Sequence, residues 1–341
     1  MRRVLIVHTW GIGDWLFFTP VITVLKETWP DVHIEVILGK PGTRNIVEHY
    51  PQVHIRAVTD VRKGPWSVLK AVVKTWHQKY DALIFTAGVD SRKADKLAFL
   101  INAKKKLALR TSQREHHFLT QVVDYDASLH KVENNLKVLD LLAITRPKNI
   151  RPFLPFDKAF EAIPESILIH PGSDSNCTFK RWPVERFASV AEKLIQRNWT
   201  VSVVLGPGEE ELSIAFTGLR DYNKFRIYQN LTLKEVSDVI CKHEVFLNND
   251  SGLGNMAAAL RKKVVSIFGP GDPTLTRPYG NHCVIIRTAR KLECMPCMRP
   301  GGLYGCSKAL CVADIGVDTV TKVLLEEPIL QKRIQVMRFE A

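Results

Sequence analysis

Short apolar runs alternate along the chain with longer segments in which apolar residues recur at helical spacing. This alternation of strands and helices predicts parallel, doubly wound sheets of the α/β class. Most of the runs are apolar at nearly every position, as is typical of strands that helices cover on both faces. The predicted strands are Val4–His8, Ile34–Leu38, Ala82–Thr86, Lys106–Leu109, Ile167–His170, Thr200–Leu205, Val245–Asn248, Val264–Phe268 and Val284–Ile286. The predicted helices are Asp14–Thr28, Trp66–Gln78, Pro183–Arg197, Leu233–Lys242 and Gly252–Leu260.

The length of 341 residues and one proline-rich stretch predict two domains. Domains commonly hold about 100–200 residues, so the chain has room for two. Four prolines between positions 147 and 164 interrupt any periodicity, which is typical of a linker. We therefore expect one domain at residues 1–155 and another at 156–320. The end of the chain is helical in pattern apart from Pro328, and we expect residues 321–341 to form a helical segment that packs back on the first domain.

The composition is that of an ordinary soluble globular protein, with 45% apolar and 24% charged residues. This apolar content excludes an intrinsically disordered chain. No run approaches the roughly 20 consecutive apolar residues that a membrane-spanning helix needs. The first residues lack the small-residue cleavage site of a signal peptide, and we expect a cytoplasmic protein.

Positive charge is concentrated in the first half of the chain. Residues 1–155 hold 24 Lys and Arg against 14 Asp and Glu, so they carry +10 of the total net charge of +13. A field of this sign attracts polyanions or an anionic membrane surface. A solvated basic face without a dedicated partner is the alternative interpretation.

A glycine-rich turn follows the first predicted strand, with the sequence Gly11-Ile12-Gly13-Asp14. The two glycines allow a tight turn and a close approach of the backbone to a ligand. Position 16 is Leu, so the turn does not match the glycine fingerprint of dinucleotide-binding proteins. Asp14 is then either a helix cap or a catalytic carboxylate in the crevice where α/β sheets bind ligands.

Two basic residues follow the predicted strand Ile167–His170. The chain continues through Ser173 to Lys180 and Arg181, just before a helix that Pro183 is suited to begin. A basic loop in front of a helix suits an anion. A solvated basic loop without a ligand is an equally good explanation.

Three further loops follow predicted strands in the second half. Gly-Pro-Gly-Glu-Glu-Glu at 206–211 places acids at a helix start, where they suit the helix dipole or accept hydrogen bonds from a ribose or base. Asn-Asn-Asp-Ser-Gly-Leu-Gly at 248–254 opens a helix of small residues, whose free N–H groups suit a diphosphate. Phe-Gly-Pro-Gly-Asp-Pro at 268–273 is either a plain turn or a nucleotide contact. Loops at the carboxyl ends of parallel strands share one edge, so together they predict a nucleotide-type ligand.

Four of the seven cysteines cluster near the C-terminus. They are Cys294, Cys297, Cys306 and Cys311. A Cys-x2-Cys pair followed by two more cysteines can surround a tetrahedral structural zinc or iron ion. Free thiols and disulfides are the alternatives, and a catalytic role is not expected.

The motifs taken together resemble glycosyltransferase family 9, the ADP-heptose:lipopolysaccharide heptosyltransferases. The resemblance rests on Gly-Ile-Gly-Asp at 11–14, Lys-Arg-Trp-Pro-x-Glu-Arg-Phe at 180–187, Gly-Pro-Gly-Glu at 206–209, Asn-Asp-Ser-Gly-Leu at 249–253 and Phe-Gly-Pro-Gly-Asp-Pro at 268–273. Each motif is weak by itself, but five in the family's order are specific. They span nearly the whole chain.

The resemblance implies a GT-B fold, in which two Rossmann-like domains face each other across a cleft. The first domain takes the acceptor and the second the nucleotide sugar. The implied reaction is inverting, metal-independent transfer of heptose from ADP-heptose to an inner-core acceptor of lipopolysaccharide, and it requires no cofactor. Such an acceptor carries acidic groups on an anionic membrane, so the resemblance also implies peripheral contact with the inner face of the cytoplasmic membrane.

The family's site residues correspond to particular positions of this chain. Asp14 corresponds to the general base, beside Gly11 and Gly13. The implied donor contacts are Ser173, Lys180, Glu210 (with Glu209 as the alternative), Asp250, Ser251, Gly252 and Asn255. Ser251 replaces a family Thr and keeps its hydroxyl, whereas Asn255 stands where several members carry His.

The implied mechanism follows from ordinary chemistry. A carboxylate at Asp14 would take the proton of the acceptor hydroxyl. Lys180 and the helix N-terminus at Ser251–Gly252 would stabilise the charge that develops on the leaving diphosphate.

Three other functions fit parts of the sequence. The first is a GT-B glycosyltransferase that uses another nucleotide sugar or a protein acceptor. The second is a nucleic-acid-binding protein, suggested by the isoelectric point of 9.4, but the chain has no recognised nucleic-acid-binding motif and we expect no specific nucleic acid. The third is a non-catalytic scaffold, against which Asp14 and Lys180 argue.

Overall fold

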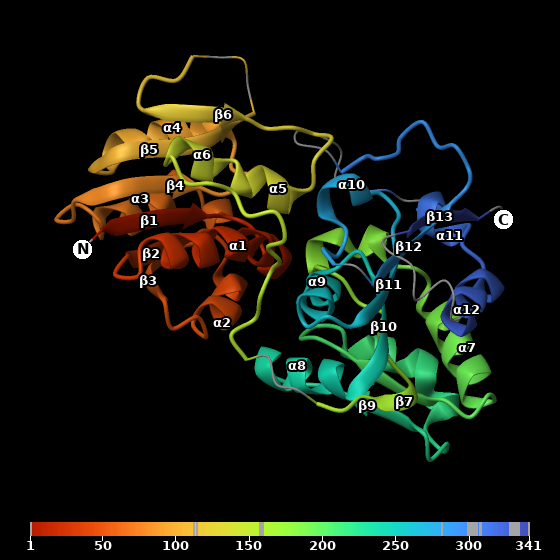
Figure 1. Cartoon of the computed structure of the whole chain (residues 1–341). Helices are drawn as coiled ribbons and strands as arrows, with labels where there is room; N and C mark the ends of the chain where they lie inside the picture. Colours follow the sequence, from red (N-terminus) through yellow and green to blue (C-terminus); the bar gives the residue numbers. More distant parts are fainter. Residues whose placement is uncertain are drawn as a thin grey trace. The chain divides into compact units, whose positions relative to one another are not determined.

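The chain forms two compact units, residues 1–155 and 156–341, each built around a parallel sheet (Figure 1). The structure, a computed structural model, describes residues 2–111, 113, 115–156, 160–280, 282–298, 306, 309–326 and 335–339, the last range as backbone only. The predicted α/β class with parallel sheets is confirmed. Within the described residues, no helix has the length and apolar character to span a membrane.

The first sheet has six parallel strands in the order β3-β2-β1-β4-β5-β6. They are β1 (Arg3–His8), β2 (His33–Leu38), β3 (Val53–Val58), β4 (Tyr80–Phe85), β5 (Ala103–Arg110) and β6 (Gln121–Asp124). The helices of this unit are α1 (Ile12–Thr28), η1 (Pro41–Thr43), α2 (Arg44–Val47), η2 (Val61–Lys63), α3 (Pro65–Val73), α4 (Ser91–Leu100), α5 (Lys131–Leu136) and α6 (Val138–Leu141). The order is that of a Rossmann sheet.

Helices cover the first sheet because its central strands β1, β2 and β4 are apolar on both faces. α3 and α4 contribute Ala71, Val72, Ala94 and Ala98 to one core cluster with Leu5 of β1. Side chains alternate between the two faces of a strand, so Val4 and Ile6 of β1 point to the other side. α1 packs against α5.

The second sheet has seven parallel strands in the order β13-β12-β11-β10-β7-β8-β9. They are β7 (Ile163–His170), β8 (Thr200–Val204), β9 (Phe225–Tyr228), β10 (His243–Asn249), β11 (Lys263–Ile267), β12 (Cys283–Thr288) and β13 (Gln335–Phe339). The helices are η3 (Ser175–Lys180), α7 (Val184–Ile195), η4 (Glu210–Leu219), α8 (Leu233–Lys242), α9 (Gly252–Ala259), α10 (Pro273–Thr276), α11 (Leu310–Ala313) and α12 (Val317–Leu325). This unit repeats the Rossmann order with one added strand.

The end of the chain differs from the prediction of one helical segment. α12 packs against α7 and buries Val320 and Val323 in the core of the second unit. Residues 335–339 form β13, which pairs in parallel with β12 and extends the second sheet. Pro328 and its neighbours lie outside the described residues.

The predicted linker is held by each unit at its ends. Phe153 donates its backbone N–H to Thr19 Oγ1 at 3.1 Å and accepts the Tyr50 hydroxyl at 2.7 Å. On the other side, Ile163 begins strand β7. The proline-rich stretch therefore connects the two units, and the residues at each of its ends belong to one of them.

Candidate active site

Each sheet has one point at which its strand order reverses. In the first sheet this point lies between β1 and β4, and in the second between β7 and β10. Open α/β sheets bind ligands at such switch points, beyond the carboxyl ends of the strands. The sequence-predicted loops lie at these two edges, each within its own unit.

The loop after β1 leads directly into α1. Gly11 is the N-cap residue of α1, with an extended backbone and no capping side chain. Asp14 lies in the first turn rather than at the cap, so the interpretation of Asp14 as a cap is wrong. Gly13, which we expected beside the substrate, lies in the first turn of α1. The carbonyl of Gly11 accepts the N–H of Trp15 at 3.0 Å.

Asp14 forms an ion pair with Lys131, which lies far from it in the sequence but in the same unit. Lys131, the first residue of α5, places its Nζ 2.6 Å from Asp14 Oδ1, and both side chains are partly exposed. α5 is fixed by the buried Asn135, which donates to the Phe17 carbonyl at 3.1 Å and accepts the N–H of Ala87 at 2.8 Å. The ion pair is thus held by two helices packed together at the switch point.

His8 at the end of β1 lies beneath this pair. Its Nδ1 is 3.1 Å from Thr86 Oγ1 and its Nε2 is 3.4 Å from the Gly11 carbonyl, which links the ends of β1 and β4. Burial lowers the pKa of His8 to about 4, although the charge of Asp14 acts in the opposite direction. His8 is therefore neutral at pH 7 and serves as a scaffold for the loop.

The second unit brings Lys180 and Asp250 together from opposite sides of its switch point. Lys180, at the end of η3, places its Nζ 2.7 Å from Asp250 Oδ2, and both side chains are largely buried. Gly271 leaves room for this carboxylate, because a Cβ there would lie 2.5 Å from Asp250 Oδ2. Three of the predicted loops therefore meet at one point.

Asn249 joins the same loops through hydrogen bonds. Its amide donates to the Pro171 carbonyl at 2.7 Å and to the Gly172 carbonyl at 3.2 Å, and its Oδ1 accepts the N–H of Trp182 at 2.9 Å. Asn249 is fully buried. These bonds fix the loop that carries Lys180 relative to the end of β10.

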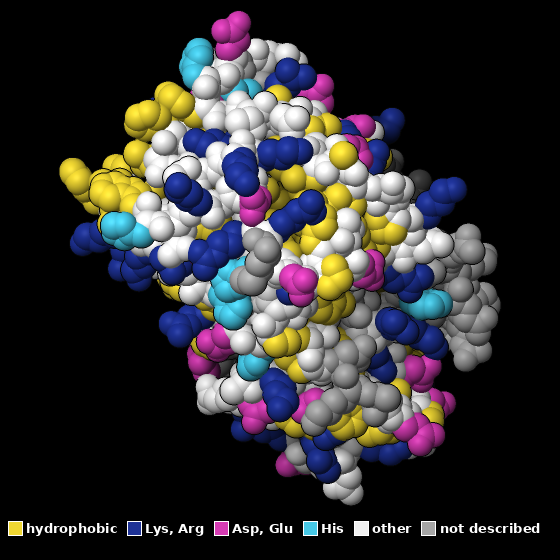
Figure 2. Space-filling view, turned by 60° about the vertical axis from the view of Figure 1, so that its left-hand side comes forward, with side chains coloured by type: hydrophobic (Ala, Val, Ile, Leu, Met, Phe, Trp, Pro, Cys, Tyr) yellow, Lys and Arg dark blue, Asp and Glu magenta, His cyan; other side chains and the backbone are white. Residues whose placement is uncertain are grey.

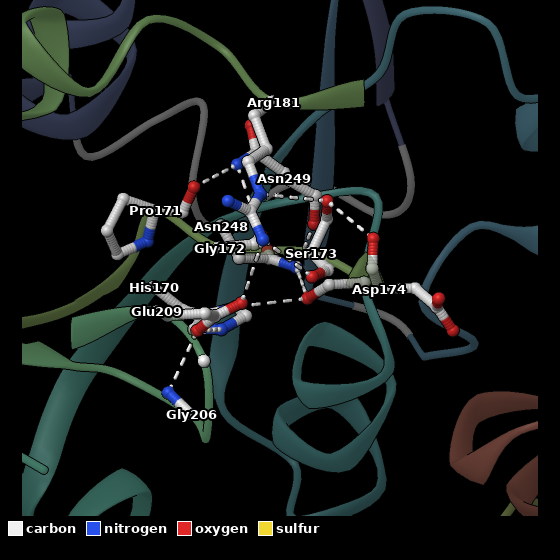
Figure 3. Close-up of polar contacts among 12 residues, drawn as sticks. His170, Pro171, Gly172, Ser173, Asp174, Arg181, Gly206, Glu209, Asn248 and Asn249 are labelled. Atoms are coloured by element: carbon white, nitrogen blue, oxygen red, sulfur yellow. Dashed lines mark hydrogen bonds and ion pairs between the residues drawn. The ribbon is translucent and has the colours of Figure 1, made fainter. Parts of the chain in front are cut away.

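A second polar network surrounds the loop after β7 (Figure 3). Arg181 donates from Nε to Ser173 Oγ at 3.2 Å and lies 3.6 Å from Glu209 Oε1. Glu209 also accepts from the N–H of Gly206 at 2.8 Å and lies 3.1 Å from His170 Nε2. Ser173 is buried here and donates to a backbone carbonyl, so its hydroxyl is part of the loop's own structure.

The structure distinguishes Glu209 from Glu210, the two acidic residues expected to bind the nucleoside. Burial raises the pKa of Glu209, but the hydrogen bonds from His170 and Gly206 and the charge of Arg181 outweigh it, so the net pKa is lowered. The carboxylate occupies the space above Gly172, where a Cβ would clash with it. Glu210 is exposed, and its Oε1 accepts the N–H of Gly208 from the same turn at 3.1 Å.

The predicted anion-binding helix begins at the end of this site. Ser251 is the N-cap residue of α9, but its side chain makes no capping bond. Its hydroxyl lies 3.3 Å from His170 Nδ1 and accepts from Asn248 at 3.2 Å. Gly252 opens the helix. Asn255 is buried in the next turn, and its Oδ1 has no hydrogen-bond partner among the described residues.

Within the residues that the structure describes, the four clustered cysteines are not arranged as a metal site. Cys294 and Cys306 are exposed, and no disulfide joins the cysteines that the structure describes. Burial, and then the neighbouring thiols of Cys297, Cys306 and Cys294, raise the pKa of Cys311 to about 11. Across the described part of the chain, no three His, Cys, Asp or Glu side chains are arranged to hold a metal ion. The structure therefore gives no support to the expected zinc or iron.

Sequence reasoning did not find Lys131 or Asn249 as organising residues, and it named Glu209 only as the alternative to Glu210. Lys131 stands in a capping box, in which His130 and Glu133 exchange hydrogen bonds, and this pattern signals only a helix start. Its partner lies 117 positions away, so no local pattern could reveal the pair.

Comparison with solved structures shows a shared two-domain fold. The structure of E. coli heptosyltransferase WaaC with ADP is 19% identical, with a TM-score of 0.73 over 94% of this chain and 98% of that one. The glycosyltransferase family 9 structure from Veillonella parvula is 20% identical, with a TM-score of 0.75 over 96% and 97%. The chain therefore has the α/β fold of the GT-B class, with two Rossmann-like domains.

The sequence comparisons narrow the class to one family. The model of glycosyltransferase family 9 (heptosyltransferase) matches residues 69–307, and the chain belongs to this family. Lipopolysaccharide heptosyltransferase 3 of E. coli K12 is 26% identical over 80% of this chain and 84% of its own length. Lipopolysaccharide heptosyltransferase 1 of Pseudomonas aeruginosa is 23% identical over 89% and 88%. The protein is a glycosyltransferase, as the motifs predicted.

Proposed function

We propose that this glycosyltransferase moves heptose from ADP-heptose to an inner-core sugar of lipopolysaccharide, with inversion at the anomeric carbon. The named relatives that cover most of the chain are lipopolysaccharide heptosyltransferases, and one structure with the same fold holds ADP. The observation that carries the proposal is the meeting of Lys180, Asp250 and the N-terminus of α9 at one switch point.

The second unit is proposed to bind the donor. A diphosphate needs positive charge and free N–H groups, which Lys180 and the first turn of α9 supply. Asp250 keeps the lysine in place before the donor binds. Glu210 is exposed beside the Gly206–Gly208 turn and is suited to accept hydrogen bonds from ribose hydroxyls, while Glu209 supports the loop beneath it.

The first unit is proposed to hold the acceptor and the base. Asp14 accepts the proton as the acceptor oxygen forms its bond to the anomeric carbon, from the face opposite the diphosphate. Lys131 positions this carboxylate. General-base catalysis of this kind contributes roughly 10²–10⁴-fold in rate.

Cleavage of the bond between the anomeric carbon and the diphosphate oxygen leaves negative charge on ADP. Lys180 and the N–H groups at Ser251–Gly252 are suited to stabilise this charge, which is the usual role of preorganised donors in a transition state. These groups supply the positive charge from the protein itself, so we expect transfer to proceed without an added divalent metal.

The acceptor and its surroundings carry negative charge, and the net charge of +10 on residues 1–155 complements them. The proposal therefore includes peripheral contact with the inner face of the cytoplasmic membrane. No specific nucleic acid is involved.

A donor screen tests the proposal. The protein is incubated with a heptose-deficient core acceptor and with ADP-heptose, ADP-glucose or UDP-sugars, and the products are weighed by mass spectrometry. We expect a gain of one heptose with ADP-heptose alone. Transfer from a UDP-sugar without transfer from ADP-heptose would identify a different GT-B enzyme.

A further inference from the structure

α3 and the turn that follows it each expose a tryptophan side chain. Trp66 in the first turn of α3 is 75% exposed, and Trp76, just beyond its end, is 55% exposed. Between them Val73 is 41% exposed. Trp66, Lys70 and Val73 follow helical spacing and form one outward stripe, whereas Ala71 and Val72 face the core. Exposed tryptophans of this kind indicate a surface that binds another molecule or a membrane.

Basic residues lie near these aromatics in the sequence, and one of them, Arg62, is ion-paired with Asp60 at 2.8 Å. The stretch 61–79 contains five Lys and Arg and no Asp or Glu. Lys63, Lys70 and Lys74 are exposed and form no ion pair with any described residue. We name the exposed side chains of Trp66, Trp76, Val73, Lys63, Lys70 and Lys74 the α3 surface. It offers apolar anchors and an unpaired positive field together.

The neighbouring helix continues this character. α3 and α4 pack on the same face of the first sheet, so their outer sides point the same way. α4 exposes Lys96 and Phe99, and the Phe99 ring, 63% exposed, lies tilted against Phe118 at 4.7 Å between ring centroids. Figure 2 shows hydrophobic side chains beside Lys and Arg side chains on one face of the molecule.

The loop before α3 is connected to the end of β1 through the loop after β2. The N–H of Gly39 donates to the His8 carbonyl at 2.7 Å, and the N–H of Val61 donates to the Gly39 carbonyl at 3.0 Å. Two backbone hydrogen bonds thus connect the loop before α3 to the strand end that precedes Asp14.

We propose that the α3 surface docks on an anionic phospholipid bilayer, with Trp66 and Trp76 at the headgroup level and the lysines against the lipid phosphates. Tryptophan is the side chain enriched at membrane–water interfaces, and clustered lysines beside it are typical of peripheral contact with anionic lipid. This surface would make the membrane contact that the proposed function includes, and the proposal rests on that function. Its test requires no transfer activity.

The experiment is flotation of the full chain with vesicles, without any sugar substrate. One set of vesicles is phosphatidylcholine alone, and the other contains phosphatidylglycerol as well. The charge variant is Lys63→Gln with Lys70→Gln and Lys74→Gln, and the aromatic variant is Trp66→Ser with Trp76→Ser. The matched controls in the second unit are Lys234→Gln with Lys242→Gln and Lys291→Gln, and Ile214→Ser with Tyr222→Ser, all at exposed positions.

We expect the protein to float with phosphatidylglycerol vesicles and not with phosphatidylcholine. Three lost lysine charges weaken partitioning by on the order of 100-fold, and the aromatic variant also loses binding, while both controls float as the parent does. All variants should melt at the parent's temperature, because the changed side chains are exposed. Flotation of the variants equal to that of the controls would overturn the proposal.

Two other binding partners of the α3 surface would give different results. Binding of a single-stranded oligonucleotide, but not of vesicles, through the same lysines would overturn the proposal in favour of nucleic acid. A dimer in sedimentation that the aromatic variant abolishes, with vesicle binding unchanged, would overturn it in favour of a second copy. The variants should keep the parent's rate on a soluble core oligosaccharide, so a failed flotation test and a failed transfer reaction remain distinct.

Discussion

Lys131 donates a hydrogen bond of 2.6 Å to the carboxylate of Asp14, although 117 positions separate them in the chain. The lysine begins α5 and the carboxylate lies in the first turn of α1, two helices that pack against each other. The pair lies at the carboxyl edge of the first sheet. In the proposed mechanism it means that the base is held in place before the acceptor arrives.

Replacement of Lys131 by Met should lower kcat by roughly ten- to a hundredfold, because a misplaced catalytic group loses rate steeply with distance. The affinity for ADP should stay unchanged, since the donor loops lie in the other unit. Lys131→Arg should recover much of the rate. Lys137→Met is the matched control, because Lys137 also donates a hydrogen bond to another element, at the Asp124 carbonyl of β6. Equal rates for Lys131→Met and the parent would exclude a positioning role.

Replacement of Lys180 by Ala should lower kcat/KM for the donor by roughly 10²–10³-fold, the usual loss when one preorganised donor to a developing charge is removed. Steady-state kinetics with varied donor concentration measure it. Lys193→Ala, which removes an exposed lysine paired with Asp318, should change nothing. A thermal melt of each variant separates lost binding from lost folding, and an unchanged kcat/KM in a folded Lys180→Ala would refute the assignment.

The neighbouring glutamates should respond differently to neutralisation. Glu209→Gln removes a buried charge that His170 and Arg181 bind, so we expect a loss of about 2–3 kcal/mol in the free energy of unfolding. Glu210→Gln should leave stability unchanged and raise KM for the nucleotide sugar. Urea titration and donor kinetics on both variants check this. A stable Glu209→Gln beside a normal Glu210→Gln would remove both roles.

His8 predicts a pH dependence of stability. Its pKa is about 4 in the fold and 6.5 in the unfolded chain, so between these values the unfolded state binds more protons. The free energy of unfolding therefore falls as the pH drops from about 6.5 to about 4, by roughly 3 kcal/mol for this group. In His8→Gln this part of the slope should vanish. Urea titrations at pH 7 and pH 4.5 measure it, and parallel slopes for parent and variant would contradict it.

The sequence predicted the centre of each sheet and missed its edges. All nine predicted strands are present, and most carry the near-continuous apolar pattern of a strand covered on both faces. The missed strands β3, β6, β9 and β13 are the four edges. β6, for example, reads Gln-Val-Val-Asp, because an edge strand keeps polar residues toward solvent.

The sequence predicted the candidate site only to the extent that each of its loops follows a predicted strand. Lys180 and Asp250 belong to two loops that the strand order places side by side, so their meeting follows from the topology. The choice between Glu209 and Glu210 did not follow, because neighbouring positions differ only in which way each side chain turns. The partners of Asp14 and Asn249 depend on packing between distant segments, which periodicity does not encode.

The most direct measurement of the central claim compares Asp14→Asn with the parent in a single turnover of ADP-heptose on a core acceptor, together with the affinity of each for ADP. We predict that the transfer rate falls by roughly 10²–10⁴-fold, while the ADP affinity stays within a few-fold and Asp31→Asn, at an exposed position of the same unit, behaves as the parent does. Normal transfer by a folded Asp14→Asn would contradict the claim that this carboxylate accepts the proton.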